Sequence, residues 1–224
     1  MSDDRLRRLG AIGSATIHEA QGQSGAVDPA IKPVWPAPRL AARAFTARCH
    51  ARDNLAVHRA VAAAEPGDAL VVDAGGHVAG YWGEILSVAA QSRGIVGLVI
   101  DGGCRDLEDV MALRFPIWAR GVSIAGCAKL QPGSIGEPVR CGGVVVRTGD
   151  FVVADADGVV IVAAAMLEEA LDAAEQRIAR ERDMMARLRE GALTLDLLGL
   201  RETLVELGLD ARSHEGDRVG DGQS

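Results

Sequence analysis

The feature that most constrains this chain is the stretch from Gly80 to Asp106, GYWGEILSVAAQSRGIVGLVIDGGCRD. Its pattern predicts a glycine loop, a helix over 84–93, a buried strand over 95–100 and a second loop. The second loop ends in an adjacent cation and anion, Arg105 and Asp106. Because the two loops flank one helix–strand unit, they can face the same small volume. We therefore take that volume as the candidate active site.

The groups on these loops suit an anionic ligand together with a metal ion. The first amides of a helix lack internal partners and sit at its positive end, so 83–86 can bind a carboxylate or phosphate. Arg105 adds a planar fork for a second pair of oxygens. Asp106 would repel that anion and is better placed to hold a hard divalent cation, which with Arg105 would neutralise a 2-oxo acid. The alternative is that Asp106 only caps the following helix, with Asp109 at capping-box spacing.

Composition and charge exclude several classes of function. The chain has 224 residues and is 48% apolar, which suffices for one good core, and a single domain is expected over 1–212. Residues 213–224 are charged and glycine-rich, and are predicted to be disordered. The net charge of -7 argues against a nucleic-acid partner, and no apolar run approaches a membrane span. These features predict a cytoplasmic protein that binds neither nucleic acid nor membrane.

The cysteines and one histidine are interpreted as structural. None of the four cysteines forms a CxxC pair, and they are Cys49, Cys104, Cys127 and Cys141. Reduced thiols are predicted, with no thiolate zinc site. Cys104, beside Arg105, could be a nucleophile, but no histidine is near it in sequence and a packing role is favoured. His58 falls on the apolar side of a predicted helix, so packing is favoured over ligand binding there too.

The secondary-structure pattern predicts a layered α/β domain. Two helices over 4–22, the second capped by Ser14, precede a strand over 40–50, a helix over 53–67 and a buried strand over 69–73. After the Arg-Asp pair come a helix, a strand and short β-branched runs separated by Gly-Asp and Asp-Gly turns, which indicate antiparallel hairpins. A dinucleotide-binding Rossmann fold is set aside, because the glycines are not spaced as G-x-G-x-x-G and no opening βαβ unit is predicted before their loop.

A long helix is predicted over 163–190. Its apolar residues follow alternating three- and four-residue steps, apart from one missing position at 181, and they are Leu167, Leu171, Ala174, Ile178, Met185 and Leu188. Glu181 falls on this seam, where a carboxylate is costly unless it is paired or lies at a junction. We expect Glu181 to meet another subunit or a polar site, and the alternative is that it lies at the solvated end of the seam.

The run that begins at Gly80 resembles the signature of the class II pyruvate aldolases, which cleave 4-hydroxy-4-methyl-2-oxoglutarate and 4-carboxy-4-hydroxy-2-oxoadipate. Three further stretches agree, ATIHEAQG (15–22), GCAKLQPGS (126–134) and GDFVVADADGVVIV (149–162). The resemblance covers most of 8–205. It implies a β/β/α sandwich of the swivelling-domain type, with N-terminal helices and a long C-terminal helix, and a homo-oligomer that is a trimer or a hexamer.

The resemblance also implies roles for individual residues. The amides that would bind pyruvate belong to the turn Gly83, Glu84, Ile85 and Leu86. Arg105 would contact the 2-oxo acid substrate, and Asp106 would bind Mg²⁺ or Mn²⁺. Glu19, in the H-E-A-x-G motif, would reach the metal site of a neighbouring subunit through water, whereas its residue type alone indicates only a capping or surface position.

Retro-aldol cleavage of a 4-hydroxy-2-oxo acid needs an electron sink for the departing pyruvate enolate, either a lysine Schiff base or a metal ion. The chain has two lysines, Lys32 and Lys129. Lys32 lies in a proline-rich stretch, and in the similar family the lysine that matches Lys129 forms no imine. We therefore expect a metal-stabilised enolate, with Arg105 on the keto oxygen and Glu84 relaying a proton through water. Lys129 would bind the distal carboxylate of the substrate or be a surface lysine.

The predicted function is metal-dependent cleavage of a 4-hydroxy-2-oxo di- or tricarboxylic acid to pyruvate and a 2-oxo acid, as in the breakdown of aromatic compounds. Oxaloacetate decarboxylation is expected as a secondary activity, because loss of CO₂ leaves the same enolate. One alternative is a non-catalytic regulator of ribonuclease E, a class of the same fold in which the metal-binding Asp is expected to be replaced, whereas Asp106 is present here. The other alternative is a lyase for a different 2-oxo acid.

Overall fold

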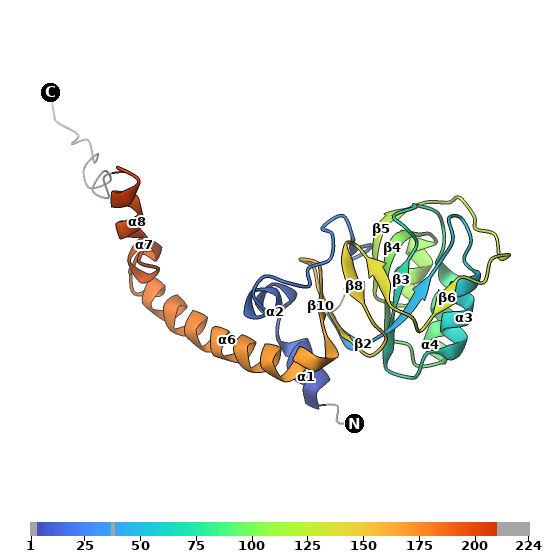
Figure 1. Ribbon diagram of the computed structural model, residues 1–224, viewed down its shortest axis with the longest axis horizontal. Coiled ribbons are helices and arrows are strands. Elements are labelled where there is room, and N and C mark those ends of the chain that lie inside the picture. Colours follow the sequence, from blue (N-terminus) through green and yellow to red (C-terminus); the bar gives the residue numbers. More distant parts are fainter. Residues whose placement is uncertain (1–3, 37–38, 210–224) are drawn as a thin grey trace. The chain divides into compact units, whose positions relative to one another are not determined.

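The computed structural model describes residues 4–36 and 39–209 (Figure 1). The chain divides into two compact units, 1–177 and 178–224, with the boundary inside one long helix. The tail predicted to be disordered, 213–224, lies outside the described residues, and the domain end placed at 212 stays a prediction.

In chain order the elements are α1 (Asp4–Ala11), α2 (Ser14–Ala20), β1 (Lys32–Pro33), β2 (Leu40–Arg48), α3 (Leu55–Ala63), β3 (Asp68–Asp73), α4 (Glu84–Ser92), β4 (Gly97–Cys104), α5 (Leu107–Ala112), β5 (Ile117–Val122), β6 (Ser134–Ile135), β7 (Val139–Cys141), β8 (Val144–Val146), β9 (Phe151–Ala154), β10 (Val159–Val162), the 3-10 helix η1 (Ala164–Met166), α6 (Leu167–Arg189), α7 (Thr194–Leu197) and α8 (Leu200–Glu206).

The first unit is built on one mixed sheet of eight strands. The order is β1–β5–β4–β3–β2–β9–β10, and β6 pairs with β2 beside this path. The strands β2 to β5 run parallel, whereas β1, β6, β9 and β10 are antiparallel to their neighbours. Every residue of β4 is buried, as expected for a parallel strand whose two faces are both covered.

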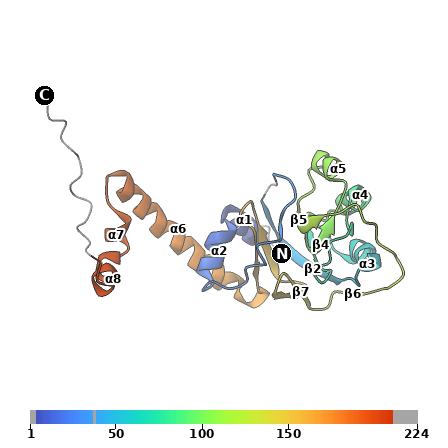
Figure 2. The ribbon, with the colours of Figure 1, turned by 90° about the horizontal axis from the view of Figure 1, so that it is seen from above.

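The sheet lies between a layer of helices and a two-stranded hairpin. Figure 2 shows α3, α4 and α5 together on one side of the sheet, where Val57, Leu86 and Val110 join a buried cluster with Leu70 and Ile100. On the other face the hairpin β7–β8 brings Val139, Cys141 and Val146 into a second buried cluster. This arrangement confirms the predicted α/β class with its β/β/α layers, and the N-terminal helices and the long C-terminal helix are present as well.

One ground for setting a Rossmann fold aside was wrong. The unit β2–α3–β3 is a parallel βαβ crossover, and it does precede the glycine loop at 74–83. The sequence had predicted the strand and the helix without their pairing, because parallel pairing depends on contacts far along the chain. The fold still differs from a doubly wound sheet, because the antiparallel strands β9 and β10 extend the sheet beyond β2.

The predicted N-cap at Ser14 also needs correction. Gly13 occupies the N-cap position of α2, and Ser14 is the first helical residue. The backbone N–H and the hydroxyl of Ser14 both donate to the carboxylate of Asp155, at 2.8 Å and 2.7 Å. The N-terminus of α2 is therefore capped by the carboxylate of the residue that directly follows β9. Burial favours the neutral acid, but these hydrogen bonds outweigh it and lower the pKa of Asp155.

The glycine loop lies directly on the end of β4. The N–H of Tyr81 donates to the carbonyl of Gly103 at 3.2 Å, and Trp82 pairs with Cys104 in an isolated parallel bridge. A Cβ at Gly103 would sit 2.5 Å from the carbonyl oxygen of Ala79, so this approach requires glycine. The loop before α4 and the loop after β4 are thereby held side by side, as the sequence predicted.

The second unit contains the end of α6 together with α7 and α8. The long helix predicted over 163–190 is confirmed as η1 followed by α6, which ends at Arg189. None of the described residues 178–209 is buried. Among the described residues, no helix has both the length and the apolar character needed to cross a membrane.

Candidate active site

The N-terminus of α4 is fixed by the residues that precede it. Gly83 is the N-cap and has an extended backbone, so the helix begins at Glu84 as predicted. The indole N–H of Trp82 donates to the hydroxyl of Ser87 at 2.8 Å, and that hydroxyl donates to the carbonyl of Gly83 at 3.0 Å. Trp82 and Ser87 are fully buried, which holds the first turn rigid. The amides of this turn lack intrahelical partners and are directed out of the helix end.

The carboxylate of Asp106 meets this helix end. Its Oδ2 accepts a hydrogen bond from the N–H of Glu84 at 3.2 Å and lies 3.4 Å from Nε of Arg105. Asp106 does occupy the N-cap position of α5, but its side chain makes no capping hydrogen bond there. The backbone of Asp106 is left-handed, with φ 58°, a conformation that costs about 1–2 kcal/mol for a residue with a side chain. Helix capping therefore does not explain why Asp106 adopts this left-handed backbone, because its side chain makes no hydrogen bond to α5.

The side chains of Asp106 and Arg105 lie so close to the backbone at position 83 that only glycine fits there. A Cβ at Gly83 would lie 2.2 Å from Oδ2 of Asp106 and 3.2 Å from Cγ of Arg105. The φ of Gly83 is -165°, which any residue can adopt, so the need for glycine is one of space alone.

A cavity of about 90 Å³ gathers most of the residues that the sequence proposed. Six predicted residues line it, and they are Gly83, Ile85, Leu86, Arg105, Asp106 and Lys129. Glu84 stands beside it, exposed, with its amide on Asp106. These residues come from three separate stretches of the chain, namely the start of α4, the loop after β4 and the loop before β6.

Two residues that the sequence did not place at the site line this cavity. Asn54 and His58, from the start of α3, line it, and each has a buried atom without a hydrogen-bond partner, Oδ1 of Asn54 and Nε2 of His58. The amide nitrogen of Asn54 donates to the carbonyl of Tyr81 at 2.8 Å. Burial and the nearby Lys129 both lower the pKa of His58. The favoured role of His58 in packing stays a prediction. The sequence signal that could have placed Asn54 beside it was their spacing of one helical turn.

Asp53 fastens the loop that carries Lys129 to the start of α3. One carboxylate oxygen accepts from the N–H of Leu55 at 3.0 Å, and the other accepts from Leu130 at 2.7 Å and Gln131 at 3.1 Å. Burial of Asp53 favours the neutral acid, but these backbone hydrogen bonds outweigh it and lower its pKa. Asp53 therefore places Lys129 beside Asn54 and His58 without touching the cavity itself.

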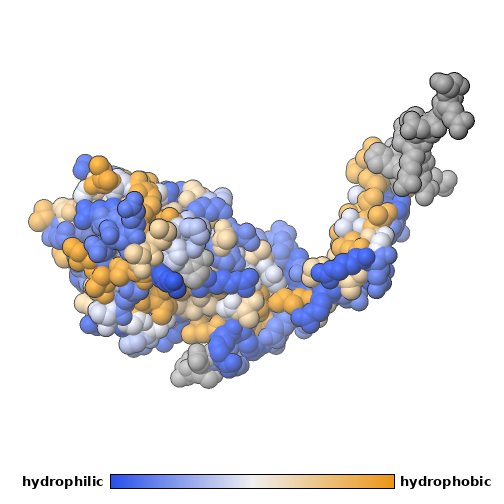
Figure 3. All heavy atoms as spheres, turned by 180° about the vertical axis from the view of Figure 1, so that it is seen from behind, coloured by the Kyte–Doolittle hydropathy of each residue, from blue (hydrophilic) through white to orange (hydrophobic). Residues whose placement is uncertain are grey.

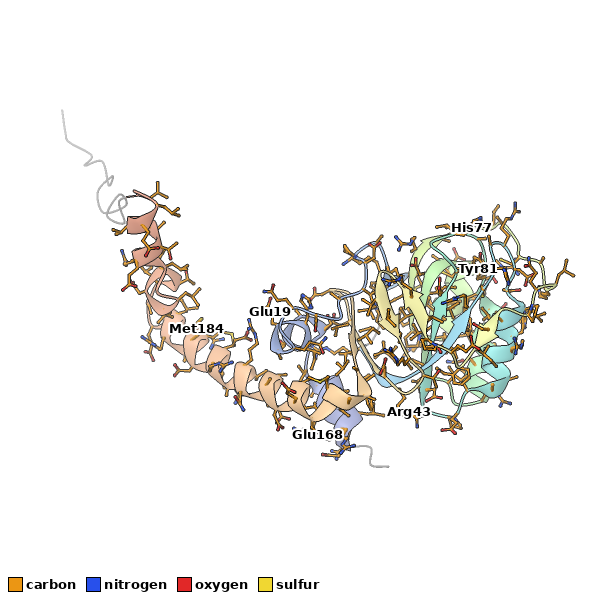
Figure 4. The ribbon with its side chains drawn as sticks, in the orientation of Figure 1. Glu19, Arg43, His77, Tyr81, Glu168 and Met184 are labelled. Carbon is orange, nitrogen blue, oxygen red and sulfur yellow. The ribbon has the colours of Figure 1, made fainter. Side chains whose placement is uncertain are left out.

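The two carboxylates predicted to act from a neighbouring subunit do not line this cavity. Glu19 lies on α2, where its carboxylate is 3.6 Å from Arg177 and within 3.4 Å of the side-chain amide of Gln23. Figure 4 shows Glu19 and Tyr81 on separate elements. Glu181 belongs to the second unit. A role for either residue in the site of another subunit stays a prediction.

The donor set around Asp106 suits one kind of metal site. Among the described residues, no three His, Cys, Asp or Glu side chains gather in a cluster that could hold a metal ion. Asp106 alone, with its side chain 36% exposed, fits an ion such as Mg²⁺, which keeps several waters and takes one or two carboxylates plus substrate oxygens. Cys104 is fully buried, and burial raises its pKa to about 12, so a nucleophilic thiolate is not available there.

A larger cavity of about 490 Å³ lies elsewhere in the first unit, between α2, β8, β10 and the start of α6. Its buried carboxylate, Asp150, is occupied by the backbone N–H groups of Arg147 at 2.8 Å and Ala164 at 3.0 Å. Its lining includes Arg147 and the exposed Glu169, but none of the residues that the sequence proposed for the site. The chemistry is therefore assigned to the smaller cavity.

Comparisons with known proteins agree with this fold. The family description "RraA-like: Aldolase/RraA" matches residues 14–161. A protein of Halalkalibacterium halodurans named "Putative 4-hydroxy-4-methyl-2-oxoglutarate aldolase" is 33% identical over 205 residues, which is 91% of this chain and 95% of that protein.

Two solved structures are similar over different lengths. The Streptomyces coelicolor protein RraAS2, described as an unusual member of the RNase ES inhibitor RraA family, has a TM-score of 0.73 and 28% identity, covering 84% of this chain and 98% of its own. The RNA-processing inhibitor RraA of Thermus thermophilus has a TM-score of 0.61 and 27% identity, covering 66% of this chain and 91% of its own.

Proposed function

The chain belongs to the Aldolase/RraA family, and from that premise we propose that it is a divalent-metal-dependent lyase that cleaves a 4-hydroxy-2-oxo acid to pyruvate and a second 2-oxo acid. The observation that carries the proposal is the meeting of three groups at one cavity. These are the first amides of α4, the guanidinium of Arg105 and the carboxylate of Asp106. A 2-oxo acid presents a carboxylate beside a keto oxygen, and these groups are complementary to both.

The helix end supplies the carboxylate site. Oδ2 of Asp106 already accepts from the amide of Glu84, so a carboxylate oxygen fits in front of this turn. In the complex the substrate carboxylate would accept from the amides at 83–86, which would free Asp106 from the amide of Glu84 to hold a metal ion. Arg105 donates to the keto oxygen and stabilises the negative charge that develops on it.

Asp106 would hold the ion. When bound, Mg²⁺ or Mn²⁺ withdraws electron density from the keto group and so stabilises the pyruvate enolate that leaves in the cleavage. As the C3–C4 bond breaks, water would take the C4 hydroxyl proton, and Glu84, exposed beside the cavity, would pass a proton through water to the enolate carbon.

The distal part of the cavity suits the other half of the substrate. The unpartnered Oδ1 of Asn54 is an acceptor, which fits a substrate hydroxyl, and the neutral ring of His58 can accept or donate beside it. Lys129 would bind a distal carboxylate. A 4-hydroxy acid with a second carboxylate would satisfy all three groups, because it carries a hydroxyl and an anion on the same side of the scissile bond.

The runner-up is a ribonuclease-regulating role, because the similar Thermus and Streptomyces proteins are described as RNA-processing or RNase inhibitors. A role in binding a nuclease does not explain why Asp106 makes no capping hydrogen bond to its own helix. It also does not explain the unpartnered buried atoms of Asn54 and His58. A lyase for another 2-oxo acid would keep the amide, arginine and metal groups and differ at the distal end.

The test is a steady-state assay for pyruvate release from both 4-hydroxy-2-oxo acids and from oxaloacetate, with Mg²⁺ and with EDTA. We expect EDTA to abolish turnover and Asp106→Ala to lower kcat by roughly 10³-fold or more. Borohydride with pyruvate should leave Lys129 unmodified. Turnover that resists EDTA, a trapped Lys129 or a near-wild-type Asp106→Ala rate would each refute the metal mechanism.

A further inference from the structure

The larger cavity of the first unit is a space that the proposed chemistry does not use. Its volume is about 490 Å³, and pockets that bind small molecules typically have about 300–1,000 Å³. It lies between the end of α2, the strands β8 and β10 and the start of α6, and it shares no lining residue with the cavity beside α4. A ligand bound in the larger cavity would therefore leave the candidate active site open.

The loop that follows α2, residues 21–25, forms one wall of the cavity and is fastened to β10. The N–H of Ile161 donates to the carbonyl of Gly25 at 2.9 Å. The side-chain amide of Gln21 donates to the carbonyls of Ser24 at 2.7 Å and of Ile161 at 3.0 Å. A Cβ at Gly25 would lie 2.3 Å from the carbonyl oxygen of Ile161, and the φ of +75° also favours glycine. This wall is therefore in place before any ligand binds.

A second wall, the turn between β8 and β9, is joined by the carboxylate of Asp150 to the start of η1. The carboxylate accepts from the backbone N–H groups of Arg147 at 2.8 Å and Ala164 at 3.0 Å. The N–H of Gly149 donates to the carbonyl of Ala44 at 2.9 Å, which holds the turn on β2. Because hydrogen bonds within the protein hold both walls, binding a ligand would require little ordering of the protein.

The cavity offers apolar side chains to a ligand. Exposed apolar residues that are scattered singly are ordinary, and the face of the first unit in Figure 3 shows hydrophobic and hydrophilic residues side by side. Val145 and Met166 differ from scattered residues, because they are 44% and 45% exposed and both line this one cavity. The side chain of Ile161 lines it as well. An apolar group that covered these side chains would remove them from water, which is favourable.

Two side chains of opposite charge also line the cavity, and neither has an ionic partner. Arg147 lies on the turn between β8 and β9, and Glu169 lies in the first turn of α6. Both are exposed, and within the described part of the chain the side chain of neither forms an ion pair or a hydrogen bond. A guanidinium is a planar fork that matches a carboxylate, and a carboxylate accepts from an ammonium group. The cavity is therefore equipped for one anion and one cation.

We infer that the larger cavity binds a small zwitterion with an apolar body, of the class of apolar amino acids and their dipeptides. The ligand carboxylate binds Arg147, the ligand ammonium binds Glu169, and the apolar body covers Val145 and Met166. A ligand with a single charge leaves one of the two charged side chains without a partner. The inference goes beyond the proposed function, because the 2-oxo acids proposed for the smaller cavity carry no ammonium group.

The test is calorimetric titration of the full chain with leucine and with leucyl-leucine. Two matched probes keep the leucine side chain but only one charge, namely 4-methylpentanoate, which lacks the ammonium, and 3-methylbutylamine, which lacks the carboxylate. We expect saturable binding of at least one zwitterion, with one site per chain. Both single-charge probes should bind more weakly by about tenfold or more, because each loses a hydrogen-bonded charge.

Variants of the full chain locate the site. Arg147→Gln and Glu169→Gln each remove one charge and should weaken binding of the zwitterion by about tenfold or more. Ala163→Trp, at an exposed lining residue, should fill the cavity and abolish binding. The controls Arg114→Gln and Glu108→Gln remove exposed charges that do not line the cavity, and they should bind as the wild type does. Thermal unfolding near the wild-type temperature identifies the variants that are folded.

Three results would overturn the inference. They are the absence of saturable binding by either zwitterion, binding of a single-charge probe as tightly as the zwitterion, and folded lining variants that bind like the wild type. None of these readouts uses the cleavage reaction, so failure of this inference and failure of the proposed function are distinguishable.

Discussion

The carboxylate of Asp106 accepts a hydrogen bond from the amide of Glu84 at 3.2 Å, although the two residues stand on opposite sides of a helix–strand unit. This contact joins the two groups that the proposed reaction uses separately. In that reaction the helix end would bind the substrate carboxylate, and Asp106 would hold the metal ion. In the free protein each satisfies the other, and a substrate with its metal ion would replace both halves of the contact.

Gly83→Ala should damage the site without unfolding the protein. The new Cβ would lie 2.2 Å from Oδ2 of Asp106, so the carboxylate must move, while the backbone of Gly83 suits alanine. We expect kcat/KM to fall by about 10²-fold or more, because small displacements of reacting groups are costly. The control is Gly126→Ala, where a Cβ meets nothing within 4 Å. Equal activities of the two variants would contradict the geometry.

His58→Leu should separate stability from activity. Nε2 of His58 is buried without a hydrogen-bond partner, which costs about 1–3 kcal/mol of desolvation free energy in the folded state. The variant removes this cost, and it also removes a group that would bind the substrate. We expect thermal unfolding at or above the wild-type temperature and a kcat/KM reduced by about tenfold. Parallel losses of stability and activity would instead identify His58 as a packing residue.

The same variant makes a pH prediction. Because burial and Lys129 lower the pKa of folded His58, the unfolded chain binds a proton more readily, near pH 6.5. The wild type should therefore lose stability as the pH falls below about 6.5, and His58→Leu should lack this component. Urea unfolding at about pH 8 and pH 5.5 gives the difference. A pH dependence that is identical in the two proteins would contradict the assigned shift.

Asp53→Asn should loosen the loop that carries Lys129. The hydrogen bonds from Leu55, Leu130 and Gln131 hold the pKa of Asp53 below its ordinary value. Its carboxylate therefore stabilises the fold above the unfolded pKa of about 3.9, and this stability is lost as pH falls through the folded pKa. The stability difference between wild type and variant should be large at about pH 7 and shrink below about pH 4. Asp109→Asn, an exposed residue of α5, is the control, and a constant difference across this range would contradict the assignment.

The sequence predicted well those features that depend on neighbouring residues. The helix at 84 and the pair of loops followed from local glycines and apolar periodicity, and the structure brings Gly83, Arg105 and Asp106 together as expected. The choice between a capping and a ligand role for Asp106 could not be made from spacing, because both place the residue before α5. In the structure the side chain of Asp106 makes no capping hydrogen bond and accepts from the amide of Glu84, and its role as a metal ligand stays a prediction.

Features that depend on distant contacts were missed. Asp155, which lies 141 residues after Ser14 in the sequence, accepts the hydrogen bond that caps α2. The sequence also predicted no βαβ unit before the glycine loop, whereas β2 and β3 pair in parallel there. Asn54 and His58 reach the cavity because Asp53 ties α3 to a loop more than seventy residues away. Hydrogen bonds between segments so far apart in sequence leave no local sequence pattern. Residues that such bonds position can therefore be identified only from the structure.

The most direct test of the central claim is a crystal structure of the protein with pyruvate and Mg²⁺. We predict that the pyruvate carboxylate lies on the amides at 83–86, that Arg105 contacts the keto oxygen, and that Asp106 has left the amide of Glu84 to coordinate the ion. The account is contradicted if Asp106 keeps its hydrogen bond to Glu84 while ion and pyruvate bind elsewhere.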